Sequence, residues 1–120
     1  MLTGGCLCGS VRYEISEPLV SAAYCHCTRC QRRTGTAASA QARVAPGSLR
    51  VVQGEELVRE WAPEDGWPKA YCSACVGALW SRSPIEDDLF SVRLGTFDTD
   101  PGIRPQWRQF VAYAASWEPI

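Results

Sequence analysis

All seven cysteines of this 120-residue chain fall into three short clusters. They are Cys6-Leu7-Cys8, Cys25-His26-Cys27-Thr28-Arg29-Cys30 and Cys72-Ser73-Ala74-Cys75. Ordinary buried thiols would be scattered along the chain, whereas thiolates that converge on one soft metal ion need short spacings and tight turns to carry them. The pattern therefore predicts a zinc protein.

Length, charge and termini restrict the remaining possibilities. The length predicts a single domain over residues 1–120, in which a bound metal would add substantially to stability. The net charge is -1 and no block of lysines or arginines occurs, so we expect no nucleic-acid partner. The chain shows no basic leader and no apolar run long enough to span a bilayer, which predicts a cytoplasmic protein without a membrane partner. An odd number of cysteines in a reducing compartment argues against a disulfide framework.

Dense turn residues predict the fold class. Ten glycines and eight prolines divide the chain into pieces mostly too short for helices, and the pieces predict an all-β domain of small antiparallel sheets. One short helix is expected at Thr28–Thr34, with Gly35 at its C-terminal end, and a surface loop at Trp61–Pro68. The expected strands are the alternating segment Val11–Ile15 and the runs Leu49–Val52, Leu57–Trp61, Ala78–Ser81, Leu89–Leu94 and Phe110–Tyr113.

The first and third clusters are natural partners for one closed site. Cys6-x-Cys8 and Cys72-x-x-Cys75 can each be presented by a tight turn, and together they supply the four thiolates of a structural zinc. Gly4, Gly5 and Gly9 are expected to allow the positive φ values of such a turn and the approach of amides to sulfur. The alternative is that the four are ordinary buried thiols.

The second cluster supplies three thiolates, Cys25, Cys27 and Cys30, with no evident fourth ligand. A catalytic zinc keeps one position for water or substrate, so this cluster is the candidate catalytic site. His26 is a possible fourth ligand, but a residue between two ligands usually points away from the ion that they share. A redox or buried thiol group without tightly held metal is the other interpretation.

Three arginines lie in or just after this cluster. Arg29, Arg32 and Arg33 are candidate substrate-binding residues, because guanidinium groups would balance the net charge of -1 on a zinc with three thiolates and contact the carboxylate of an anionic ligand. Alternatively, they are solvated charges on a short helix.

Three segments together resemble the family of glutathione-dependent formaldehyde-activating enzymes and centromere protein V. These segments are Gly4-Gly5-Cys6-Leu7-Cys8-Gly9-Ser10-Val11-Arg12-Tyr13, Cys25-His26-Cys27-Thr28-Arg29-Cys30-Gln31-Arg32-Arg33-Thr34-Gly35 and Tyr71-Cys72-Ser73-Ala74-Cys75. The resemblance implies a β-tent of small antiparallel sheets around a structural zinc. It also implies that Cys6, Cys8, Cys72 and Cys75 hold that ion and that Cys25, Cys27 and Cys30 hold a second, catalytic one.

The chain departs from this family at two places. Val76 and Gly77 follow Cys75, where the family usually has Gly and then Ser or Thr. Near the C-terminus, Arg108-Gln109-Phe110-Val111 stands where the family often has His-x-Phe-Val, no Lys or Arg precedes Trp117, and the longer tail of many relatives does not follow. If those groups hold the carboxylates of glutathione, part of that site is absent here.

The resemblance implies a zinc-dependent carbon–sulfur lyase or synthase. A thiol, glutathione in the family, would bind at the second zinc and add to a small aldehyde such as formaldehyde, giving an S-hydroxymethyl adduct. The alternative is a non-enzymatic zinc-binding interaction domain with a vestigial second metal site, which the altered C-terminus favours. A fourth protein ligand at the second site would support that alternative.

Overall fold

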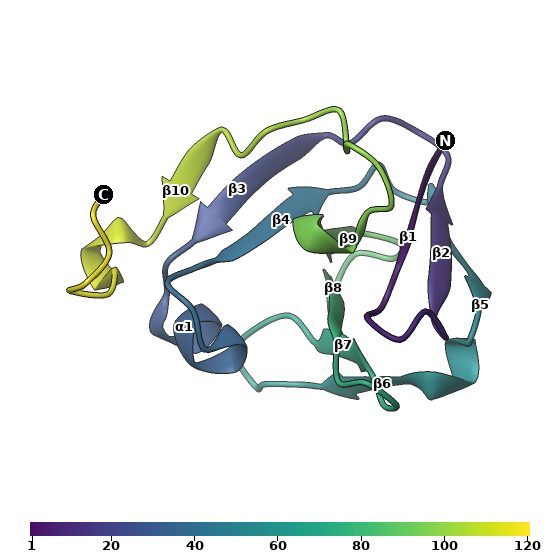
Figure 1. The fold of residues 1–120 in the computed structure, drawn as a ribbon, viewed down its shortest axis with the longest axis horizontal. Coiled ribbons are helices and arrows are strands. Elements are labelled where there is room, and N and C mark those ends of the chain that lie inside the picture. The colour runs from purple at the N-terminus through teal and green to yellow at the C-terminus, as the bar shows by residue number, and fades with distance from the viewer.

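The computed structural model describes residues 1–120 and contains ten β-strands, one α-helix and three single-turn 3-10 helices. Figure 1 shows the strands curving around a common interior, with the helix on the same side of the molecule as the C-terminus. The elements in chain order are β1 (Leu2–Gly5), β2 (Arg12–Ile15), β3 (Ser21–Cys25), α1 (Thr28–Thr34), β4 (Ser39–Arg43), β5 (Leu49–Gln53), η1 (Glu55–Leu57), β6 (Val58–Trp61), β7 (Lys69–Cys72), β8 (Ala78–Arg82), β9 (Phe90–Arg93), η2 (Leu94–Thr96), β10 (Trp107–Gln109) and η3 (Val111–Tyr113).

The strands form two sheets of unequal size. One has three strands in the order β1-β2-β5, and the other has seven in the order β10-β3-β4-β9-β8-β7-β6. Neighbouring strands are antiparallel except for β10 and β3, which run parallel. The all-β prediction is confirmed, and the larger sheet joins strands from both halves of the chain.

The hydrophobic core lies between the two sheets, and strand β2 shows how the sequence directs side chains into it. Tyr13 and Ile15 are fully buried, while Glu14 between them is not, as the two-residue period of a strand requires. The Tyr13 ring packs edge-to-face against Trp80 of β8 and against Phe97, with ring centroids 6.1 and 5.9 Å apart. These aromatic contacts join the smaller sheet to the larger one.

Helix α1 begins and ends where the sequence predicts. Cys27 precedes it in an extended conformation, and its Sγ accepts a hydrogen bond from the Cys30 N–H at 3.2 Å. Gly35 follows it with φ 68°, and its N–H donates to the Gln31 carbonyl at 2.8 Å. The helix therefore follows directly after one cysteine of the second cluster and carries another.

No helix in the structure combines the length and apolar character needed to cross a bilayer.

Most of the predicted strands are present, but the one at Phe110–Tyr113 is wrong. Phe110 has a left-handed backbone with φ 57°, and the single turn η3 follows it, so the last strand is β10 instead. The loop predicted after Trp61 is confirmed and connects β6 to β7. Five strands, β1, β3, β4, β7 and β10, are not predicted from the sequence.

Candidate functional site

The first and third cysteine clusters meet at the junction of the two sheets. Cys6 and Cys8 lie in the connection from β1 to β2, Cys72 ends β7, and Cys75 lies in the turn before β8. The four Sγ atoms are within 4.8 Å of one another, with 3.6 Å between Cys6 and Cys8 and 4.0 Å between Cys8 and Cys72. Sulfur ligands of a tetrahedral zinc ion are about 3.8 Å apart, so the four thiols fit such an ion.

Backbone amides donate to the first pair of sulfurs, and hydrogen bonds favour the thiolate form of Cys8. The Val11 N–H donates to Cys6 Sγ at 3.3 Å. Hydrogen bonds from the side chain and backbone of Ser10, followed by one from Cys6, lower the pKa of Cys8 to about 6. Metals bind the thiolate, so both features favour metal binding at this cluster.

The glycines around this cluster serve two purposes, of which the sequence predicts one. Gly9 has a positive φ of 78°, as expected. Gly4 and Gly5 lie in extended strand β1 and have no positive φ, so the prediction is wrong for them. A methyl group at Gly4 would overlap the Tyr13 hydroxyl and lie 2.5 Å from the Thr96 carbonyl oxygen. Glycine is required there by close packing.

The second cluster gathers its three cysteines around the start of α1. Cys25 ends β3, Cys27 precedes the helix, and Cys30 lies in its first turn. Their Sγ atoms lie within 4.8 Å of one another, and Cys25 and Cys30 are buried. Three sulfur donors suit a divalent ion such as zinc, and they leave one position of its tetrahedron without a protein ligand.

Two of these thiols, Cys25 and Cys30, differ sharply in their ease of ionisation. Burial raises the pKa of Cys25 to about 12. Burial also opposes the ionisation of Cys30, but hydrogen bonds from Ser39 and Cys27 and the charge of Arg33 outweigh it and lower the pKa to about 7. Cys30, next to a cation, therefore ionises more readily than Cys25.

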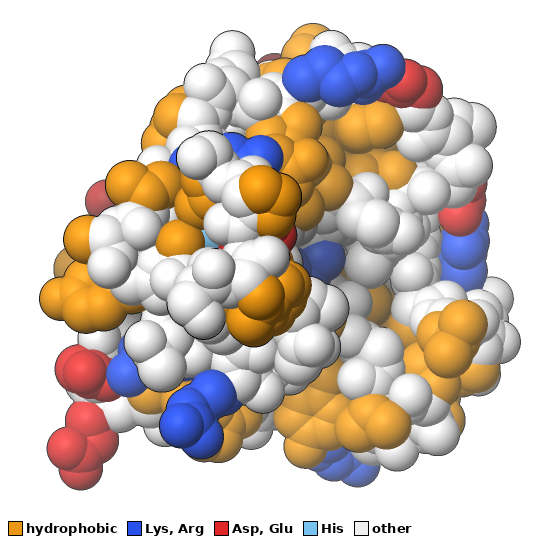
Figure 2. Space-filling view, turned by 60° about the vertical axis from the view of Figure 1, so that its left-hand side comes forward, with side chains coloured by type: hydrophobic (Ala, Val, Ile, Leu, Met, Phe, Trp, Pro, Cys, Tyr) orange, Lys and Arg blue, Asp and Glu red, His pale blue; other side chains and the backbone are white.

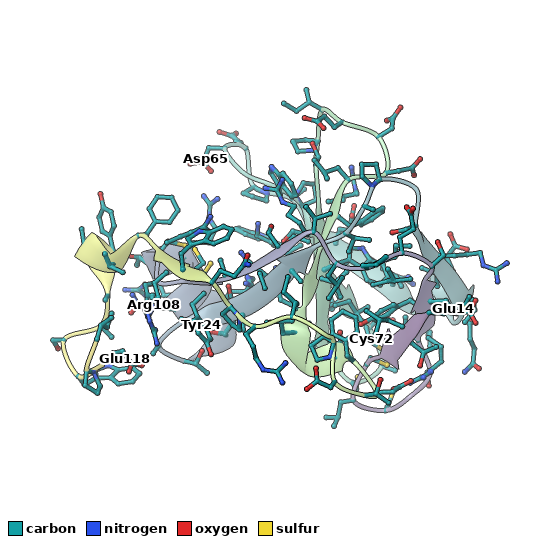
Figure 3. The ribbon with its side chains drawn as sticks, turned by 90° about the horizontal axis from the view of Figure 1, so that it is seen from above. Glu14, Tyr24, Asp65, Cys72, Arg108 and Glu118 are labelled. Atoms are coloured by element: carbon teal, nitrogen blue, oxygen red, sulfur yellow. The ribbon has the colours of Figure 1, made fainter.

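His26 faces away from the three thiols. Its imidazole is fully buried, and Nε2 lies 2.9 Å from Arg108 Nη1. An arginine can only donate, so His26 Nε2 accepts this hydrogen bond. The Arg108 guanidinium also lies over the Tyr24 ring, 4.7 Å from its centroid, and Figure 3 shows this pair far from Cys72 of the other cluster. The second cluster thus forms without a histidine ligand.

The C-terminal segment is attached directly to this cluster. The Gln31 side-chain amide donates to the carbonyl oxygens of His26 and Tyr113, at 2.8 Å each. Phe110, whose backbone is left-handed, lines the cavity beside the cysteines. Figure 2 brings this side of the molecule forward and shows hydrophobic side chains at its surface. The exposed residues of the segment include Trp107, Phe110, Val111, Tyr113 and Trp117.

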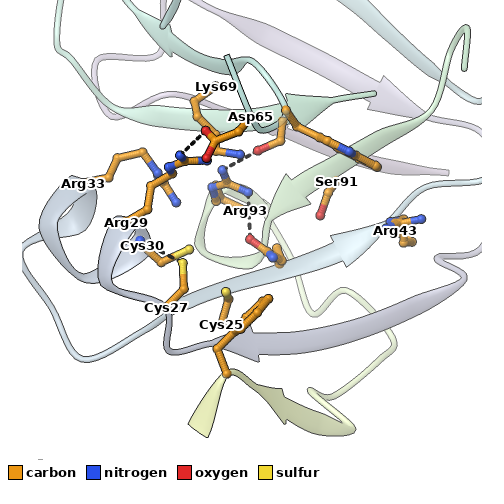
Figure 4. A pocket seen from close by; sticks show the side chains of 14 residues that line it. Cys25, Cys27, Arg29, Cys30, Arg33, Arg43, Asp65, Lys69, Ser91 and Arg93 are labelled. Carbon is orange, nitrogen blue, oxygen red and sulfur yellow. Dashed lines mark hydrogen bonds and ion pairs between the residues drawn. The ribbon is translucent and has the colours of Figure 1, made fainter. Parts of the chain in front are cut away.

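A cavity of about 420 Å³ opens onto the three thiols (Figure 4). This volume is in the range of small-molecule sites. Of the three arginines predicted to bind substrate, Arg29 and Arg33 line the cavity. Arg32 does not; it is exposed and lies at a separate hollow beside Trp61. The structure therefore brings two of the three predicted arginines to the predicted thiols.

Three further cations line the cavity and are not predicted from the sequence. They are Arg43 of β4, Lys69 of β7 and Arg93 of β9. Burial and then the positive charges of Arg93 and Arg33 lower the pKa of Lys69. No local motif marks these three residues, because they meet only once the order of the strands is known.

Arg93 is the most deeply placed of these cations. Only 7% of it is exposed, and its Nη1 and Nη2 donate to Gln41 Oε1 at 2.9 Å and to Ser81 Oγ at 2.7 Å. Burial, followed by the charge of Arg33, lowers its pKa to about 10. Arg93 remains charged near neutral pH, since this pKa is still well above 7, and the two hydrogen bonds hold the guanidinium in position.

Comparison with known proteins identifies this arrangement. The sequence profile of the glutathione-dependent formaldehyde-activating enzymes matches residues 1–113. The chain belongs to this family. A Halomonas elongata protein named "Putative glutathione-dependent formaldehyde-activating enzyme" is 28% identical over 106 residues, which cover 83% of this chain and 68% of that protein. The crystal structure of a Rhodobacter sphaeroides protein shares the fold, with a TM-score of 0.66, 22% identity and coverage of 88% of this chain and 98% of that one.

Val76, which stands where the family usually has glycine, adopts a backbone conformation that favours glycine. This β-branched residue has a φ of 58°, in the left-handed region where glycine is favoured. Its N–H donates to the Cys72 carbonyl at 2.7 Å, and the Cys72 N–H donates to the Gly77 carbonyl at 3.0 Å. The turn that presents Cys72 and Cys75 is therefore retained, but with a strained residue in it.

Proposed function

We propose that this protein is a zinc-dependent carbon–sulfur lyase that joins a thiol to formaldehyde, or to a similar small aldehyde, and cleaves the same adduct in reverse. The family's name indicates glutathione as the first thiol to test. One observation carries the proposal: three clustered thiols without a fourth protein ligand border a cavity lined by cations. A closed structural site would have no reason to face such a cavity.

The two clusters have different parts in this proposal. Cys6, Cys8, Cys72 and Cys75 would hold a structural zinc at the junction of the sheets. Cys25, Cys27 and Cys30 would hold the second ion, which when bound lowers the pKa of a coordinated thiol so that it is a thiolate at neutral pH. Arg29 and Arg33 would balance the negative charge and contact a carboxylate of the substrate.

The reaction is a balanced addition. The substrate sulfur attacks the carbonyl carbon of the aldehyde, a carbon–sulfur bond forms, and the π bond of the carbonyl breaks. The carbonyl oxygen takes up a proton equivalent to the one that the thiol has lost. A thiol and formaldehyde therefore give an S-hydroxymethyl thiol without a redox partner. The cavity would hold the two reactants together, which lowers the entropic barrier to their encounter.

The alternative is a zinc-binding interaction domain with a vestigial second site. A fourth protein ligand at the second cluster would favour it, but the His26 ring is directed at Arg108. The volume of the cavity and the positions of Arg29 and Arg33 in it favour the enzyme.

The Cys27→Ser variant tests the proposal. Serine is a good helix N-cap, so the hydrogen bond from the Cys30 N–H would be retained while the soft sulfur ligand is removed. We expect the variant to hold one zinc ion fewer per chain and to lose acceleration of the exchange between glutathione and S-hydroxymethylglutathione, measured by NMR with ¹³C-formaldehyde. An unchanged exchange rate in a variant that has lost that zinc would overturn the proposal.

The Cys72→Ser variant distinguishes the two metal sites. Cys72 is fully buried at the junction of the sheets, so loss of its thiolate would release the structural ion and lower the free energy of unfolding by several kcal/mol. Cys27→Ser is expected to cost less than Cys72→Ser, because the ion that it releases links only residues 25–30 of the chain, Cys27 is only half-buried, and its cap is preserved. Zinc content and urea unfolding of both variants measure the difference.

A further inference from the structure

The cavity concentrates positive charge far beyond the composition of the chain. The chain has 12 lysines and arginines against 13 acidic residues, yet five of those cations line this one cavity with a single acid, Asp65. The cations come from four separate elements of the fold, as Figure 4 shows for the labelled side chains. They are Arg29, Arg33, Arg43, Lys69 and Arg93. Cations that repel one another inside a protein are tolerated where a ligand of opposite charge is bound.

Two of these arginines have no carboxylate partner in the protein. Nε and Nη2 of Arg33 and Nε of Arg93 are buried atoms without any hydrogen-bond partner in the chain. Leaving a buried donor unpaired costs about 1–3 kcal/mol, and more for a charged group. Arg93 is held in position by Gln41 and Ser81, so its remaining donor is fixed before a ligand arrives.

The single acid is already engaged. Asp65 Oδ1 lies 2.5 Å from Arg29 Nη2, and no other Asp or Glu lines the cavity. Glutathione carries two carboxylates and one ammonium group, and an ammonium group needs an acceptor, best a carboxylate. The cavity offers ample donors for the carboxylates but no free carboxylate for the ammonium group.

We infer that the preferred thiol of this protein carries at least two anionic groups and no ammonium group. This inference rests on the proposed function for the place of the sulfur, at Cys25, Cys27 and Cys30. Arg33, Lys69 and Arg93 would contact the anionic groups of the substrate. Glutathione would enter the same cavity with its ammonium group unpaired among cations, which lowers its affinity.

A matched pair of ligands tests the inference on the zinc-loaded protein. Glutaryl-cysteinyl-glycine is glutathione with the ammonium group replaced by hydrogen, and the affinity of each ligand is measured by isothermal titration calorimetry under the same conditions. The deaminated ligand is expected to bind about tenfold more tightly, since it removes one unpaired charge from a cationic site. Equal or weaker binding of the deaminated ligand would overturn the inference.

The S-methyl forms of the two ligands separate this inference from the proposed function. They keep every charged group but cannot bind a metal as thiolates. If the deaminated S-methyl ligand still binds more tightly, the anion site is real even where the exchange assay has failed. If the preference disappears when sulfur is blocked, the charge argument is wrong although the metal chemistry stands.

Two adjacent arginines supply matched protein variants. Arg33→Gln and Arg32→Gln change the net charge equally on the same helix, but only Arg33 lines the cavity. Arg33→Gln is expected to weaken binding of the deaminated ligand about tenfold, and Arg32→Gln to change it less than about twofold. If Arg33→Gln does not fold, Lys69→Gln is the same test. Equal losses in the cavity variant and the Arg32 control would contradict the inference.

Discussion

Asp65 and Arg29 join the loop between β6 and β7 to helix α1 across the edge of the cavity. Asp65 Oδ1 lies 2.5 Å from Arg29 Nη2, and the same guanidinium lies over the Trp61 ring, 5.7 Å from its centroid. The Arg29 hydrogen bond holds the pKa of Asp65 below its usual value, so the pair stays ionised well below neutral pH. The pair engages the one acid of the cavity and partly neutralises Arg29, whose other donors still line the cavity.

Replacing Asp65 by Asn is expected to strengthen anion binding. The change removes the negative charge and frees Arg29 to face the ligand, but both groups are partly exposed, so the gain should be no more than about fivefold. Titration of the deaminated glutathione analogue measures it, with Glu86→Gln, on an exposed loop, as the control for net charge. Weaker binding of glutathione itself would instead show that Asp65 accepts its ammonium group.

The pH dependence of anion binding should report on Lys69. Burial and the charges of Arg93 and Arg33 lower its pKa in the free protein, below the ordinary 10.5, because they disfavour the charged form. A bound carboxylate favours that form and raises the pKa, so binding takes up a proton. Affinity for the deaminated S-methyl ligand should therefore fall as the pH rises from 8 toward 10. Arg93, with a pKa of about 10, is still charged in the lower half of this range. Lys69→Gln should therefore abolish the decline there, and a decline that persists would assign it to another group.

Val76 is expected to be less suitable than glycine at its position. It is 74% exposed, so Val76→Gly removes little packing and relieves the left-handed strain. We expect the free energy of unfolding to rise by about 1 kcal/mol in urea denaturation of the zinc-loaded protein. Ala74→Gly in the same turn, at a residue without positive φ, should lower it by about 0.5–1 kcal/mol. A loss in both variants would show that Val76 is not strained.

Gly4 should tolerate no side chain, in contrast to Gly95. An alanine methyl at Gly4 would overlap the Tyr13 hydroxyl, which is 2.7 Å from Thr96 Oγ1, whereas a methyl at Gly95 meets nothing within 4 Å. Gly4→Ala should cost about 1–3 kcal/mol of unfolding free energy. Gly95→Ala should be close to neutral, and similar losses in the two variants would contradict this explanation.

The sequence predicts features that depend on neighbours in the chain and misses those that depend on the order of strands. The helix at Thr28–Thr34 matches because its stop at Gly35 is a local signal. The cysteine clusters gather as predicted because ligand spacing is also local. Strands β3 and β4 are rich in Ala and Ser, which have weak strand preference, and they are strands because they lie inside the seven-stranded sheet.

The wrongly predicted strand near the C-terminus and the cavity cations that were not predicted both depend on the folded chain beyond local sequence. The run at Phe110–Tyr113 has the composition of a strand, but the left-handed backbone of Phe110 turns the chain. The Tyr113 N–H then donates to the Phe110 carbonyl oxygen at 3.0 Å, which closes a single turn. Lys69 and Arg93 are far apart in sequence, and strand β8 lies between their strands in the sheet. Nothing around either residue in the sequence indicates that they line one cavity.

The four cysteines of the first site become available at different times during synthesis of the chain. Its first two members leave the ribosome long before Cys72 and Cys75, and chains emerge N-terminal end first. During that interval Cys6 and Cys8 form only half of a binding site, open to any soft ion or oxidant nearby. A nascent chain cut short before Cys72 would lack half of the four-sulfur site, and quality control would meet it as an unfinished product with Cys6 and Cys8 unpartnered.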